Sequence, residues 1–140
     1  MGEDQVRGHC LCGQVRYVAD GEPKWCAHCH CTDCRRAVAS AFATFVGYER
    51  NKVHFVAGQP HHYESSPGVF RSSCPNCGTP ISYESKQFPG ELHLMIGTLE
   101  DPAAFTPQGE VMCREKLPWL RMQVDGESLQ GFSAEEESQG

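Results

Sequence analysis

The chain has 140 residues, which suits one domain, and 39% of them are hydrophobic, so a core is possible but small. A formal net charge of −6 with scattered basic residues argues against nucleic acid as a partner. No apolar run approaches the roughly 18 residues that a membrane helix needs, and residues 1–7 lack the apolar region of a signal peptide. We therefore expect a cytoplasmic protein that does not contact a membrane.

Short strands are predicted along most of the chain. Alternating, branched and aromatic residues indicate the strands, and Gly or Pro punctuates nearly every gap between them. The predicted strands cover residues 15–18, 41–46, 53–56, 62–64, 69–71, 81–83, 92–96 and 120–124. Residues 32–39 and 102–105 are expected to form helical turns, both too short to be stable in isolation.

This pattern predicts an all-β or mostly β fold with zinc knuckles at its turns. Residues 8–132 are expected to form one zinc-binding β domain. Residues 1–7 are expected to be a flexible arm. Residues 133–140 are acidic and have no large apolar side chain, so we expect a disordered tail there.

The nine cysteines far exceed ordinary usage for a chain of this length. In a reducing compartment, clustered cysteines indicate metal ligands more often than disulfides. Disulfides are the alternative, although the neighbouring thiols of Cys10 and Cys12 are awkward to bridge to each other.

Seven of the cysteines lie in short-range clusters, and that number divides into four plus three. Four ligands close a tetrahedral zinc shell, whereas three leave one position open. The count therefore predicts two zinc ions per chain, one structural and one able to take part in chemistry.

Two cysteine pairs have the form of knuckle turns. Cys10-Leu11-Cys12 and Cys74-Pro75-Asn76-Cys77 are each followed by a glycine, Gly13 or Gly78, which allows the chain to fold back so that backbone amides face the sulfurs. Each pair supplies two ligands. The simplest prediction joins Cys10, Cys12, Cys74 and Cys77 into one structural site, which would stabilise the fold by about 10 kcal/mol.

The triple of Cys29, Cys31 and Cys34 offers only three thiols in a tight arc. A zinc ion on three thiolates suits a soft fourth ligand such as a substrate thiol. Alternatively, Cys26 or His28 closes the shell, and the chain is then a non-catalytic, zinc-stabilised binding module. His30 is expected to be a packed or supporting histidine rather than a ligand.

Five segments, in this order and at compatible spacing over residues 8–132, resemble the glutathione-dependent formaldehyde-activating enzyme and centromere protein V family. They are Gly8-His9-Cys10-Leu11-Cys12-Gly13-Gln14-Val15-Arg16-Tyr17, Cys29-His30-Cys31-Thr32-Asp33-Cys34-Arg35-Arg36, Cys74-Pro75-Asn76-Cys77-Gly78-Thr79-Pro80, Ile96-Gly97-Thr98-Leu99-Glu100-Asp101-Pro102 and Glu115-Lys116-Leu117-Pro118-Trp119.

The resemblance implies small layered antiparallel sheets and two zinc sites. It implies that Cys10, Cys12, Cys74 and Cys77 hold the structural zinc and that Cys29, Cys31 and Cys34 hold the catalytic one. The implied activity is that of a carbon–sulfur lyase acting on a thiol–aldehyde adduct, with glutathione and formaldehyde as the family's substrates. Where many members carry a histidine, this chain has Glu110-Val111-Met112-Cys113, which leaves the roles of Glu110 and Cys113 open.

Three arginines are candidates for pairing with a substrate carboxylate, because the guanidinium fork matches that group. They are Arg35, Arg36 and Arg71. Trp119, Phe42 and Tyr83 are candidates for pocket walls or for core packing. Two further alternatives stay open: a redox role for Cys74 and Cys77, and iron in place of zinc.

Overall fold

The computed structural model describes residues 5–132. It divides into two compact units: residues up to Lys24 with Val46–Ala104, and Trp25–Phe45 with the residues from Phe105 onward. The strand β4 (Ala43–Glu49) crosses the boundary between them. Each unit is built from segments far apart in the sequence. That residues 8–132 form one domain stays a prediction.

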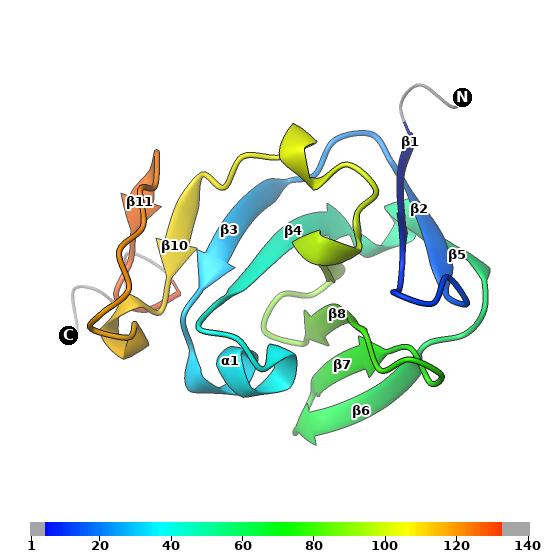
Figure 1. Ribbon diagram of the computed structural model, residues 1–140, viewed down its shortest axis with the longest axis horizontal. Coiled ribbons are helices and arrows are strands. Elements are labelled where there is room, and N and C mark those ends of the chain that lie inside the picture. The colour runs from blue at the N-terminus through cyan, green and yellow to red at the C-terminus, as the bar shows by residue number, and fades with distance from the viewer. Residues whose placement is uncertain (1–4, 133–140) are drawn as a thin grey trace. The chain divides into compact units, whose positions relative to one another are not determined.

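The first unit is made almost entirely of antiparallel strands (Figure 1). Its three-stranded sheet has the order β1-β2-β5 and comprises β1 (Gln5–His9), β2 (Arg16–Asp20) and β5 (Val53–Ala57). A second set has the order β9-β8-β7-β6 and comprises β6 (His61–Ser66), β7 (Val69–Ser73), β8 (Pro80–Ser85) and β9 (Glu91–Met95). Three 3₁₀ turns also lie in this unit: η2 (Arg50–Lys52) precedes β5, and η3 (Ile96–Thr98) and η4 (Pro102–Ala104) follow β9.

The core of the first unit is small and centres on Tyr17. This side chain is 1% exposed, and its hydroxyl lies 2.7 Å from the Thr98 hydroxyl, so its polar end is satisfied. A β-carbon at Gly8 would lie 2.3 Å from the Tyr17 ring, which explains a glycine there. Other fully buried apolar side chains of this unit include Val15, Val46, Tyr48, Ile81, Leu92 and Leu94.

Gly58 follows β5 directly, in a conformation that only glycine adopts easily, with φ of +69°. A β-carbon there would lie 2.4 Å from the backbone oxygen of Gln14, which cannot rotate away. We expect Gly58→Ala to lower the free energy of unfolding by about 2–4 kcal/mol, from backbone strain plus the clash. Denaturant unfolding measures this. Gly21→Ala is the control, because Gly21 has φ of +73° but open space around it. Equal losses of unfolding free energy in both variants would show that the clash with Gln14 contributes nothing.

The second unit carries parallel strand pairs, which the sequence did not predict. The order is β11-β10-β3, formed by β3 (Trp25–Cys29), β10 (Gly109–Val111) and β11 (Glu127–Ser128). The register places Glu110 beside His28 and Val111 beside Cys29. After β3 the chain enters the helix α1 (Thr32–Val38), and after β10 it enters the 3₁₀ turn η5 (Cys113–Glu115).

The mostly β fold, with small antiparallel sheets, confirms the prediction. The helical turns also form where expected, as α1 and η4. The strand predicted over residues 120–124 is wrong, because Arg121 folds back and donates from Nη1 to the carbonyl oxygens of Pro118 and Leu120. These contacts hold that stretch in an irregular loop.

The chain ends differ in part from expectation. Residues 1–7 were expected to form a flexible arm, but Gln5 to Arg7 belong to β1, where they pair with β2. Residues 1–4 and the expected tail at 133–140 lie outside the described residues. Within residues 5–132, no helix is long and apolar enough to cross a membrane.

Candidate metal centres

The first unit brings two distant cysteine pairs together into one cluster, which we call the four-cysteine group. The four Sγ atoms all lie within 4.8 Å of one another. Cys12 Sγ lies 3.7 Å from Cys10 Sγ and 3.8 Å from Cys74 Sγ, although 62 residues separate Cys12 from Cys74. The group consists of Cys10, Cys12, Cys74 and Cys77.

Backbone amides point at the sulfurs of the four-cysteine group. Val15 N donates to Cys10 Sγ at 3.3 Å, and the amides of Asn76 and Cys77 both donate to Cys74 Sγ at 3.4 Å. Gly13 and Gly78 each have φ of +81°, so the turns fold back as the glycines predicted. Donors around sulfur stabilise thiolate rather than thiol, and thiolate is the form that binds metal.

Side-chain contacts complete this environment. Leu11 N donates to Thr79 Oγ1 at 3.0 Å, which links the two knuckles directly, and Asn76 Nδ2 donates to Cys12 Sγ at 3.3 Å. A hydrogen bond with the Thr79 hydroxyl lowers the pKa of Cys77 to about 5. Four sulfurs at this spacing, at least one ionised at neutral pH, form a closed shell suited to a metal ion.

The second unit holds the three-cysteine group of Cys29, Cys31 and Cys34, whose sulfurs also lie within 4.8 Å of one another. Cys29 ends β3, Cys31 precedes α1 as its N-cap, and Cys34 lies in the first turn of the helix, with its amide donating to Cys31 Sγ at 3.2 Å. Cys29 and Cys34 are buried, whereas Cys31 is half-buried. Cys31 is therefore the least buried member of the group.

The crowding of these sulfurs favours a bound cation. Contacts with Cys31, then Cys34, together with burial, raise the pKa of Cys29 well above its usual value. Three adjacent thiolates repel one another in a buried setting, and a divalent cation relieves that repulsion. The donor set therefore fits a metal ion with a preference for sulfur.

No fourth ligand from the described residues completes the three-cysteine group. Cys26 and His28, the two residues considered for closing it, both lie outside the set of mutually close ligand atoms. His28 instead places Nδ1 2.7 Å from the Thr44 hydroxyl and packs edge-on against Phe42. The carbonyl of Cys26 accepts a hydrogen bond from Gln108 N. Within residues 5–132, the group offers three candidate ligand atoms.

His30 lies between two cysteines of the group and is fully buried. Its Nε2 lies 2.7 Å from Glu110 Oε1, which also accepts from Lys116 Nζ at 3.1 Å, while Oε2 accepts from Ser128 Oγ at 2.7 Å. Burial alone would raise the pKa of Glu110, but the bonds from Ser128, His30 and Lys116 outweigh it and lower the pKa to about 2. The buried position of His30 agrees with the packed or supporting histidine that the sequence predicts, whereas no local pattern indicates a role for Glu110.

The depressed pKa of Glu110 predicts acid sensitivity. Because the folded-state pKa lies below the ordinary 4.5, the carboxylate stabilises the fold above that pH, and the contribution is lost as pH falls toward 2. We expect Glu110→Gln to cost about 2–3 kcal/mol at pH 7. The difference from the parent chain should shrink below about pH 4.5. Denaturant midpoints of both chains from pH 3 to 7 measure this difference in stability. A difference that does not change with pH would contradict the stabilising role of the Glu110 carboxylate.

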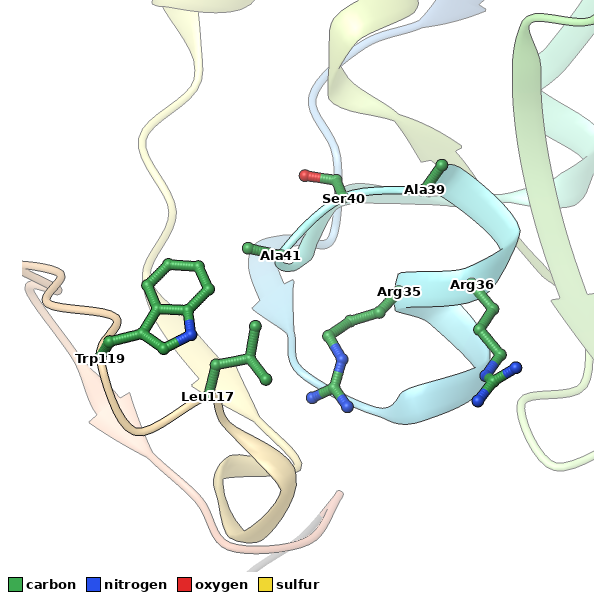
Figure 2. Close-up of a pocket in the computed structure, with 7 residues that line it drawn as sticks. All are labelled: Arg35, Arg36, Ala39, Ser40, Ala41, Leu117 and Trp119. Carbon is green, nitrogen blue, oxygen red and sulfur yellow. The ribbon is translucent and has the colours of Figure 1, made fainter.

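A shallow, open cavity of about 660 Å³ lies against α1 in the second unit. Figure 2 shows Trp119 and Leu117 on one side and Ser40 and Ala41 on the other. Its lining residues are Arg35, Arg36, Ala39, Ser40, Ala41, Leu117 and Trp119. Trp119 is 66% exposed, so it is a pocket wall and not a core residue.

Of the three candidate arginines, two already have other contacts. Arg35 Nη1 donates to the carbonyl oxygens of His30, at 2.9 Å, and of Glu115, so it ties α1 to η5. Arg71 lies over the Tyr83 ring, 4.9 Å from its centroid. Within residues 5–132, no hydrogen bond or ion pair of Arg36 occurs, which leaves its guanidinium for a ligand.

The fold and the two groups together define a mostly β protein with two cysteine-rich sites able to hold metal ions. The sequence model of the glutathione-dependent formaldehyde-activating enzyme family matches residues 5–115. The chain belongs to this family. No curated protein sequence matches the chain significantly.

Among solved structures, the chain resembles a crystal structure of a Rhodobacter sphaeroides protein. The TM-score is 0.55 with 21% sequence identity, and the match covers 67% of this chain and 87% of the other. At this identity the likeness concerns the fold alone.

Proposed function

We propose that this protein is a zinc enzyme that joins a thiol to the carbon of a small aldehyde, or splits the resulting adduct, as a carbon–sulfur lyase. The three-cysteine group carries this proposal, because within residues 5–132 it brings together three candidate ligands and not four. Family membership supports glutathione and formaldehyde, or a closely related pair, as substrates.

The cysteines have separate proposed roles. Cys10, Cys12, Cys74 and Cys77 hold a structural zinc, and Cys29, Cys31 and Cys34 hold the second ion. A zinc ion in the three-cysteine group would supply an open position at which a substrate thiol is acidified and held as thiolate. Iron would satisfy the same thiolates, but zinc binds both closed sets of four thiolates and open sets of three protein ligands without redox chemistry.

The cavity beside α1 suits the rest of such a substrate. Arg36 follows Cys34 by two residues and can pair with a carboxylate through its guanidinium fork. Trp119 and Leu117 offer an apolar wall for a carbon chain. In this proposal Arg36, Trp119 and Leu117 bind and orient the substrate. The backbone contacts of Arg35 hold α1 in place.

The test is exchange of formaldehyde between its free and glutathione-bound forms, followed by NMR with ¹³C-formaldehyde. The chain loaded with two zinc ions should accelerate exchange at least about 100-fold over buffer. The Cys31→Ser variant should not accelerate it. A fully zinc-loaded chain without effect on glutathione, cysteine or 2-mercaptoethanol adducts would favour a non-catalytic binding module instead.

A further inference from the structure

The strand β6 lies at the end of its set of strands in the first unit. In the order β9-β8-β7-β6 it pairs with β7 alone among the strands that the structure describes (Figure 1). All six of its residues, His61–Ser66, are exposed. In an antiparallel pair, alternate residues turn both N–H and C=O away from the neighbouring strand. The outer side of β6 therefore offers a row of backbone donors and acceptors to a further strand.

The sequence of β6 protects this edge only at its two ends. The strand contains no Lys and no Pro, the residues that most often keep a further strand away from an edge. Pro60 and Pro67 flank it, and its register with β7 shifts between Glu64 and Ser66. The prolines and this bulge limit further pairing to residues 61–65 and prevent a long ladder.

A second copy of β6 is the partner that this short segment fits. Outward backbone groups must meet outward backbone groups, so two antiparallel copies that use most of the strand place His62, Tyr63 or Glu64 on the two-fold axis. The axis at His62 sets two imidazoles together, and the axis at Glu64 sets two carboxylates together. The axis at Tyr63 instead places His62 opposite Glu64 of the second copy, and it does so twice, which is the favourable pairing.

The cross-strand neighbours of Tyr63 agree with that axis. Tyr63 lies opposite Arg71, Arg71 opposite Tyr83 and Tyr83 opposite His93, so these side chains form one row on one face. Arg71 lies over the Tyr83 ring at 4.9 Å, and the Tyr83 and His93 rings stack with centroids 5.4 Å apart. Tyr63 ends the row and is 63% exposed. Tyr63 of a second copy would continue the row with an aromatic pair.

We propose that β6 is a dimer interface, at which two copies of this chain pair antiparallel about a two-fold axis at Tyr63. The His62 imidazole donates to the Glu64 carboxylate of the second copy. Glu64 Oε2 accepts from Gly68 N at 2.9 Å, and a carboxylate has room for this further donor. Each copy presents the same segment, so the pairing closes at two copies. Neither cysteine group takes part, so the interface goes beyond the proposed function.

The association is expected to be weak, because so short a ladder buries little surface. Sedimentation equilibrium of the zinc-loaded parent chain from about 10 μM to 1 mM should show the average mass rising from 15.5 kDa toward twice that value. His62→Glu sets carboxylate against carboxylate twice per dimer, so its dissociation constant should be at least about tenfold higher. Combining His62→Glu with Glu64→His restores the opposite pairs and should return the constant to within about threefold of the parent value.

His61→Glu is the matched control. It makes the same change of residue and charge one position away, but residue 61 would face Ser65 of the second copy, so the constant should change less than about threefold. All these positions are exposed, and the parent measurement needs no variant. A parent chain that stays monomeric up to about 1 mM would overturn the proposal. A dimer that His62→Glu weakens no more than His61→Glu does, or that the combined variant does not restore, would also overturn it.

Discussion

Cys74→Ser is expected to unfold most of the protein at 37 °C. Cys74 is 2% exposed, and its sulfur joins the knuckle at residues 74–77 to that at residues 10–12. Structural zinc sites supply on the order of 10 kcal/mol, and whole domains have a net stability of only about 5–15 kcal/mol. We therefore expect a loss of about 5 kcal/mol or more, together with one zinc ion per chain. Thermal unfolding by circular dichroism and zinc analysis measure the two effects.

Cys26→Ala is the matched control for that variant. Cys26 is also a buried cysteine, but it lies outside both groups. Its replacement should cost only about 1 kcal/mol and leave both zinc ions in place. If Cys74→Ser kept its zinc and melted within a few degrees of the parent chain, the four-cysteine group would not be a structural metal site.

The second large effect is expected at Cys31, on activity and not on stability. This cysteine is the half-buried member of the three-cysteine group. Cys31→Ser removes one of three thiolates, so the second zinc ion should be lost. The rate of formaldehyde exchange should fall about 100-fold or more, because metal activation of a nucleophile is worth several kcal/mol.

The first unit should remain folded in Cys31→Ser, since the four-cysteine group is untouched. Asp33→Asn is the control: Asp33 is exposed between Cys31 and Cys34, so its replacement changes the local charge but no sulfur. Exchange by that variant should stay within about twofold of the parent rate. Full activity in Cys31→Ser would place the chemistry elsewhere in the molecule.

Much of the fold and of the cysteine grouping was predictable, because the signals are local. Cysteines two or three residues apart fall within one turn of backbone, and Gly13 and Gly78 fold that turn back. Alternating patterns identified most strands of the first unit, where antiparallel neighbours follow closely in sequence. The short strands β3 and β10 were missed, since neither has an alternating pattern and they pair with each other across about 80 residues.

The sequence by itself determined the family, the mostly β class and the division of seven cysteines into four and three, since these follow from residue identity and short spacing. Tertiary structure decided which neighbours each side chain meets. In the folded chain Arg35 donates to backbone carbonyl oxygens, whereas Arg36 does not. Cys26 and His28 lie outside the three-cysteine group. Glu110 and Cys113 lie beside His30. These outcomes depend on pairing between distant strands, and no local pattern encodes such pairing.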